Sequence, residues 1–135
     1  MDLDQSANFN IMEVYGPRSV HPDSRRVCLP KALAVPLRLV AGAHAWVGPS
    51  PSRSGELIVA PAAPPADRLG RRDLARPRRV TNGNQLTLPA ALMAEVGLNP
   101  QNPWVYFARD DQEDGVRIIP SGRVQVHVNS GASHE

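Results

Sequence analysis

The sequence holds a single cysteine, Cys28, and its aromatic residues make up only 4% of the chain. One cysteine excludes a disulfide within the chain and suits a reducing compartment. Because aromatic side chains are scarce, a core has to be built mainly from valine, leucine, isoleucine and alanine. No apolar run approaches the roughly 20 residues of a membrane-spanning helix, and residues 1–12 lack the basic and apolar segments of a secretory signal. We therefore expect a cytoplasmic protein with no membrane partner.

Residues that bind metals or carry out catalysis show no recognisable pattern. The four histidines and one cysteine lack the spacing of a zinc site. No nucleophile–base arrangement and no paired carboxylates stand out. The acidic run from Asp110 to Asp114 has the charge of a calcium loop but not its spacing, and a solvated turn explains it better. We therefore expect neither an enzyme nor a bound metal or cofactor.

The net charge of +2 conceals a strong segregation along the chain. Residues 1–17 hold three acidic residues and no basic one, whereas residues 18–79 hold twelve basic residues against four acidic ones. Residues 80–135 hold three basic and six acidic residues. Such segregation favours a polyanion-binding zone, since evenly spread charge would be enough for solubility. A basic solvated linker is the alternative explanation.

Two segments of the chain share the same order of apolar residues and proline. Residues 27–33, VCLPKAL, match residues 86–92, LTLPAAL, at an offset of 59. The two tryptophans, Trp46 and Trp104, lie 58 residues apart, and we predict that they fill equivalent core or interface positions. The pattern is typical of an internal repeat. Each half alone is about 50 residues, too few for a large core, so the halves should share one, with each other or with a second chain.

Both copies predict a strand–strand–helix–strand–strand unit. In the second copy, Asn82-Gly83-Asn84 is a hairpin turn signal, and Pro89 and Gly97 suit the two ends of a short helix. In the first copy, Pro36 should shorten or bend the helix, because proline in a helix interior costs about 3 kcal/mol. The predicted elements are extended segments or strands at Phe9–Tyr15, Val20-His21, Arg26–Leu29, Ala43–Val47, Glu56–Ala60, Arg79–Thr81, Gln85–Leu88, Trp104–Phe107 and Val116–Ile119, and helices from Pro30 and over Ala90–Val96.

The expected organisation follows from these elements. Residues 8–61 form the first repeat, and residues 62–77 form a linker rich in proline and arginine. Residues 78–121 form the second repeat, and residues 122–135 form a tail that can add one strand at Val124–Val128.

Residues 78–93, RRVTNGNQLTLPAALM, resemble the AbrB/MazE/SpoVT superfamily. Its members share a basic strand, a polar turn, an apolar strand that ends in Leu/Ile-Pro, a short helix and a Gly-Leu ending, which Gly97-Leu98 supplies here. The resemblance covers most of the second copy and, more weakly, the first. It implies a mostly β fold with short helices, a swapped-hairpin β-barrel formed from two interlocked strand–strand–helix–strand–strand repeats.

The resemblance also implies a set of DNA-binding residues. In MazE-like members a basic pair on the first strand and an Asn in the turn hold DNA, and Arg78, Arg79 and Asn82 stand at those positions. In AbrB-like members an Arg lies four residues before the strand-ending proline, where this chain has Arg26 in the first copy and Gln85 in the second. The candidate DNA-binding residues are Arg25, Arg26, Lys31, Arg78, Arg79, Asn82, Asn84 and Gln85.

The chemistry of these side chains suits duplex DNA. Guanidinium groups form forked hydrogen bonds with phosphate or guanine, and Asn or Gln can pair with adenine. We expect a sequence-specific transcriptional regulator that binds a pseudo-palindromic double-stranded site, as a homodimer or as an intramolecular pseudo-dimer. Two alternatives remain open. One is an antitoxin that binds a toxin protein and its own promoter, and the other is an assembly protein that uses the fold to oligomerise.

Overall fold

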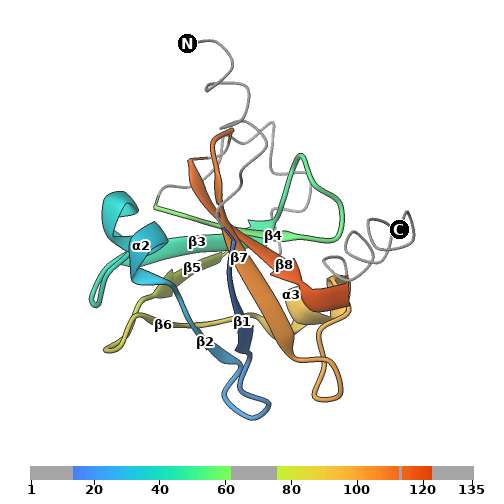
Figure 1. The fold of residues 1–135 in the computed structure, drawn as a ribbon. Coiled ribbons are helices and arrows are strands. Elements are labelled where there is room, and N and C mark those ends of the chain that lie inside the picture. The colour runs from blue at the N-terminus through green and yellow to red at the C-terminus, as the bar shows by residue number, and fades with distance from the viewer. Residues whose placement is uncertain (1–13, 62–75, 113, 123–135) are drawn as a thin grey trace.

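The structure is a computed structural model that describes residues 14–61, 76–112 and 114–122. These residues form a mostly β fold with short helices, as the sequence predicts (Figure 1). The elements in chain order are β1 (Tyr15–Ser19), β2 (Arg26–Cys28), α2 (Lys31–Ala34), the 3-10 helix η1 (Val35–Leu37), β3 (His44–Pro49), β4 (Leu57–Ala60), β5 (Arg76–Arg79), β6 (Gln85–Thr87), α3 (Ala90–Glu95), β7 (Trp104–Asp110) and β8 (Gly115–Pro120).

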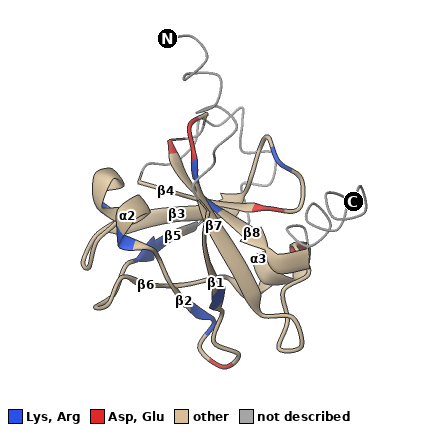
Figure 2. Ribbon diagram, in the orientation of Figure 1, with Lys and Arg blue, Asp and Glu red and all other residues tan. Residues whose placement is uncertain are grey.

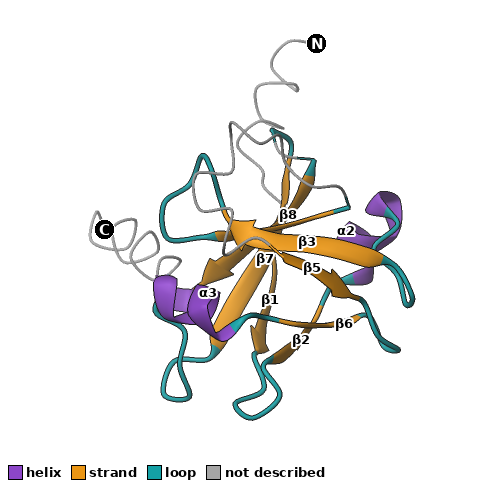
Figure 3. Cartoon of the chain, turned by 180° about the vertical axis from the view of Figure 1, so that it is seen from behind, coloured by secondary structure: helices purple, strands orange, loops and turns teal. Residues whose placement is uncertain are grey.

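The strands pair between the two repeats as well as within them. One antiparallel sheet has the order β1-β7-β8-β4-β3-β5, and β2 and β6 form a separate two-stranded sheet (Figures 1 and 3). The first strand of each repeat therefore pairs with the third strand of the other, β1 with β7 and β5 with β3. The second strands pair with each other, and so do the fourth strands. Neither sheet closes on itself within the described residues.

The register of these pairs relates the repeats by a local twofold axis. On the β2–β6 ladder, Val27 lies opposite Leu86, its own equivalent 59 residues further along the chain. On the β4–β8 ladder, Ile58 lies opposite Arg117 at the same offset. An antiparallel pair in which equivalent residues face each other has a twofold axis at that position, so strands of the two segments pair about a local twofold axis within this chain.

Both repeats contribute to one hydrophobic core. Equivalent positions in the two repeats carry the same kind of side chain, for example Leu29 and Leu88, which are each at most 1% exposed. Leucine, valine and isoleucine make up most of this core, and within the described ranges Phe107 is the one aromatic residue among its fully buried side chains. The shared core agrees with the expectation that neither half is large enough to fold around a core of its own.

The two helices end in the same way although their sequences differ. In α3, the N–H of Leu98 donates to the carbonyl of Met93, around a left-handed Gly97 with φ of 79°. In the first repeat, α2 continues into η1 at the predicted Pro36, and the left-handed residue is Arg38 with φ of 61°. The prediction of a shortened first helix is confirmed, and so is the left-handed end at Gly97.

The predicted equivalence of the two tryptophans is wrong. Ala45 lies opposite Arg78, and Val105 lies opposite Arg18, so β3 and β7 align at an offset of 60 and Trp104 corresponds to His44. Trp104 is 47% exposed, and Trp46 is only half-buried on the outer face of β3. The predicted offset of 58 differs from the observed 60 by two residues. Because side chains alternate between the two faces of a strand, a shift of two residues keeps each side chain on the same face, so the alternating pattern could not reveal the error.

Two predicted boundaries also differ from the structure. Strand β5 begins at Arg76, inside the predicted linker of residues 62–77, because its backbone pairs with β3 from Val47 onward. Strand β1 is Tyr15–Ser19 and runs through Pro17, in the gap between two predicted extended segments. Both strands lie at the edges of the large sheet, where proline is tolerated. The rest of the predicted Phe9–Tyr15 strand and the tail strand Val124–Val128 lie outside the described residues.

Gly115 is required where β8 packs against β4. A Cβ at this position would lie 2.5 Å from the carbonyl oxygen of Val59 and 3.0 Å from the Cδ1 atom of Ile58. Because the nearer atom belongs to the backbone, we expect Gly115→Ala to lower the free energy of unfolding by about 1–3 kcal/mol, measured by urea unfolding. Gly122→Ala, where no atom lies within 4 Å, is the control and should change it by less than about 0.5 kcal/mol. Equal effects of the two variants would contradict this packing.

Candidate nucleic-acid interface

The β2–β6 ladder lies at the centre of the candidate interface. Its inward side chains are those of Val27 and Leu86, which are 2% and 1% exposed. Its outward side chains are those of Arg26 and Cys28 on β2 and of Gln85 and Thr87 on β6, with Arg26 opposite Thr87 and Cys28 opposite Gln85. We call these four residues, together with the flanking Lys31, Arg79 and Asn82, the ladder surface.

A hairpin turn stands at each end of this ladder. The β1–β2 turn is held by Nδ1 of His21, which accepts hydrogen bonds from the backbone N–H groups of Asp23 and Ser24 at 3.2 Å. In the β5–β6 turn, the N–H of Asn84 donates to the carbonyl of Thr81 at 3.1 Å. The two turns end at equivalent left-handed residues, Arg25 and Asn84, each with φ of 58°.

These two left-handed residues connect the repeats. The carbonyl of Arg25 accepts from the N–H of Leu88 at 2.8 Å, and the carbonyl of Asn84 accepts from the N–H of Leu29 at 2.9 Å. Nε of Arg25 also donates to the carbonyl of Leu88 at 3.0 Å. Arg25 is half-buried, and Asn84 is only 8% exposed. The predicted contact of Asn84 with DNA has no exposed side chain to support it, because its position under the turn removes the side chain from the surface.

The other predicted residues differ in exposure. Arg26, Lys31, Arg79 and Asn82 are exposed, and Gln85 is half-buried on the ladder. Arg78 is half-buried opposite Ala45, and its Nε is buried without a hydrogen-bond partner in the described part of the chain. The exposed residues come from β2, the start of α2, β5 and the β5–β6 turn.

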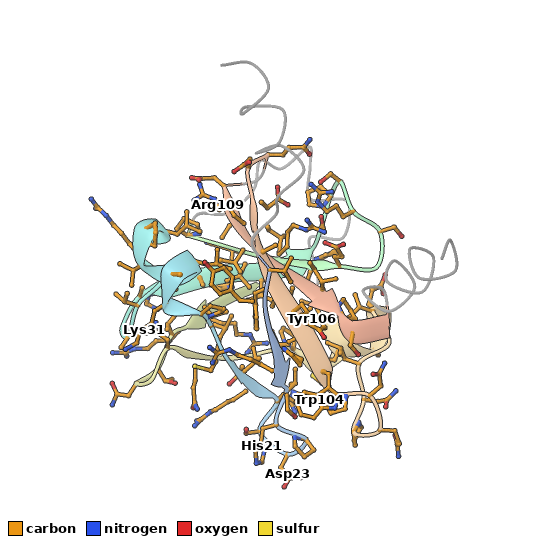
Figure 4. All side chains as sticks on the ribbon, in the orientation of Figure 1. His21, Asp23, Lys31, Trp104, Tyr106 and Arg109 are labelled. Carbon is orange, nitrogen blue, oxygen red and sulfur yellow. The ribbon has the colours of Figure 1, made fainter. Side chains whose placement is uncertain are left out.

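The structure gathers these basic residues on one side of the molecule. Figure 2 shows Lys and Arg on β1, β2, β5 and the start of α2, on the side that carries the β2–β6 ladder. Acidic residues gather instead at the β7–β8 turn, where Arg109 forms an ion pair with Asp114 at 2.7 Å. In Figure 4, Lys31 lies at one end of the ladder and His21 and Asp23 at the other, while Arg109 lies far from both. Among the described residues, the Lys and Arg side chains of β1, β2, β5 and the start of α2 therefore share one side of the molecule.

Arg18 is a basic residue that the predicted set did not include. It lies on β1 opposite Val105, is exposed, and is equivalent to Arg78 at an offset of 60. The sequence prediction placed no strand at this position, so the residue had no assigned place. The signal that could have found it is the repeat itself, since Pro17-Arg18 and Pro77-Arg78 share an order of residues.

The described residues show neither a metal-binding cluster nor a membrane-spanning helix. They contain no group of three or more His, Cys, Asp or Glu side chains arranged to hold a metal ion. None of the helices described is both long enough and apolar enough to cross a bilayer.

A scan of the chain against protein-family models and a search of the curated proteins both found no match.

Proposed function

We propose that this protein is a sequence-specific transcriptional regulator that binds double-stranded DNA in the cytoplasm through the ladder surface. The observation that carries the proposal is the position of Arg26 and Gln85 on the outward face of a rigid two-stranded ladder, flanked by Arg79 and Lys31. Their inward neighbours on the ladder, Val27 and Leu86, are fixed in the core. The backbone that carries the DNA-facing groups is thus held in place before DNA binds.

The strand pairing supports a swapped-hairpin barrel as the framework of this surface. Each repeat supplies its first strand to the third strand of the other repeat, and the second strands meet at the local twofold axis. Such interlocking is what the resemblance to the AbrB/MazE/SpoVT superfamily implies. In this arrangement one chain provides two related halves of a DNA-binding surface, and no second copy is required to form it.

Each type of side chain has a distinct task in this proposal. The guanidinium of Arg26 can form two parallel hydrogen bonds with the O6 and N7 atoms of guanine, and the amide of Gln85 can pair with adenine. Lys31 and Arg79 flank the ladder and provide phosphate contacts, which fix the position of the protein on the duplex. Asn82 is exposed at the tip of the β5–β6 turn, where its amide can reach a base edge or a phosphate.

The proposal predicts a loss of DNA binding when the ladder surface loses its charge. We expect the double variant Arg26→Ala, Arg79→Ala to bind its DNA about 30-fold more weakly or worse, since each arginine contact is worth about 1–3 kcal/mol. Because Arg79 contacts a phosphate in this proposal, the slope of log affinity against log salt should also fall by about 0.9. Mobility shifts over a range of salt concentrations, with DNA selected from a random duplex pool, measure both quantities.

The control removes the same charge elsewhere. Arg38 and Arg109 are exposed and line one hollow of the surface together with Pro61, and neither belongs to the ladder surface. Arg38→Ala, Arg109→Ala should bind DNA within about threefold of the unchanged protein, because screening weakens long-range attraction beyond about 10 Å. An equal loss in both double variants would mean that net charge and not the ladder surface holds the DNA.

A further inference from the structure

The local twofold axis holds in the core but not on the ladder surface. Inward equivalents such as Leu29 and Leu88 are identical, and both are buried. Outward equivalents differ in chemistry at almost every position. Arg26 corresponds to Gln85 and Cys28 to Thr87 on the ladder, and Lys31 to Ala90 and Ser19 to Arg79 around it.

The strand pairing decides at which end of the ladder each flanking residue lies. The N–H of Leu29 donates to the carbonyl of Asn84, so the chain that leaves β2 and reaches Lys31 lies beside the β5–β6 turn. By the same symmetry, the chain that leaves β6 and reaches Ala90 lies beside the β1–β2 turn. Figure 4 agrees, since it places Lys31 on the opposite side of the ladder from His21 and Asp23.

The two ends of the ladder surface therefore present different groups. The end at the β1–β2 turn carries Arg26 on the ladder, with the exposed Arg18 on β1 and the acidic Asp23 in the turn, and no lysine from the following helix. The end at the β5–β6 turn carries the amides of Gln85 and Asn82, with Lys31 and Arg79 beside them. One end offers an arginine for base contact, and the other offers amides for base contact between two cations.

We propose that the ladder surface binds a directional, non-palindromic DNA site, with a guanine contacted by Arg26 in one half and an adenine contacted by Gln85 in the other. The inference rests on the proposed function, and it replaces the pseudo-palindromic site that the repeat alone suggests. Arg79 and Lys31 contact phosphates only on the adenine side. A symmetric backbone that carries unlike side chains fixes which half of the site lies under which repeat.

The length of the ladder also limits the spacing of the two halves. Arg26 and Gln85 each lie one residue from the local axis, so they are about 7 Å apart along the strands, and Arg25 and Asn84, where the two turns end, are about 14 Å apart. One helical turn of DNA measures about 34–36 Å. Both halves of the site must therefore lie within about half a turn, or five base pairs, and not one turn apart.

The test is selection of bound DNA from a random duplex pool with the full chain, followed by the same selection with Gln85→Arg. The unchanged protein should enrich a non-palindromic motif, with about a tenfold or greater preference for guanine in one half and for adenine in the other. Gln85→Arg gives both repeats the same residue at this position, so the adenine should be replaced by guanine and the motif should become palindromic. Gln85 is partly exposed on the ladder, so this variant is expected to fold.

The control is Gln112→Arg, the same substitution at an exposed residue of the β7–β8 turn, and it should leave the motif unchanged. A palindromic motif for the unchanged protein would overturn the inference, and so would half-sites about ten base pairs apart. Binding without any enriched motif would also overturn it while leaving DNA binding intact. Failure to bind any duplex at low salt would instead overturn the proposed function itself.

Discussion

Replacing Glu56 with alanine is expected to lower the free energy of unfolding by about 3–5 kcal/mol. The carboxylate of Glu56 accepts two hydrogen bonds from Arg117, from Nε at 2.8 Å and from NH2 at 2.9 Å. Glu56 is 4% and Arg117 is 7% exposed. Without the carboxylate, the guanidinium loses two hydrogen bonds and a neighbouring negative charge in a site with little access to water, and this loss lowers the stability.

Urea unfolding followed by circular dichroism measures this loss, and a second variant separates charge from packing. In Glu56→Leu, Arg117→Leu both charges are gone, so most of the stability lost in Glu56→Ala should return, because a buried ion pair is often no better than apolar residues of similar volume. A loss below about 1 kcal/mol in Glu56→Ala would contradict the buried ion pair.

The same ion pair also selects which repeats can combine. Glu56 belongs to the first repeat and corresponds to Gly115 in the second, while Arg117 belongs to the second and corresponds to Ile58 in the first. If two second repeats combined, two arginines would face each other at the local axis without either glutamate. The pairing of one first repeat with one second repeat is thus favoured by charge, and a single chain supplies both.

Features that depend on neighbouring residues were predictable from the sequence. The Asn82-Gly83 turn, the shortened helix before Pro36 and the left-handed Gly97 all follow from local backbone preferences. Each of them has its predicted place in the structure. The pairing of strands between repeats could be expected only through the resemblance, because hydrogen bonds between strands leave no local mark in the sequence.

The candidate site was predictable in part for the same reason. Arg26 and Arg79, which the resemblance assigned to DNA, stand at exposed positions, but Asn84 is buried. The turn signal is the same whether the last turn residue faces water or the other repeat, so the sequence could not distinguish the two cases. The contact between Glu56 and Arg117 spans 61 residues and has no counterpart in the repeat pattern, since the equivalent residues are uncharged.

Replacing Phe107 with alanine is expected to lower the free energy of unfolding by about 3–5 kcal/mol, whereas Trp104→Ala should lower it by no more than about 1 kcal/mol. Phe107 is fully buried on β7, opposite Tyr15 of β1 and Ile118 of β8, so its removal leaves a cavity between strands of both repeats. Trp104 is 47% exposed, and much of its ring already contacts water.

Urea unfolding followed by far-ultraviolet circular dichroism, which does not depend on tryptophan emission, compares the two variants. The opposite order would support the 58-residue alignment, in which the tryptophans and not Val47 and Phe107 occupy equivalent core positions.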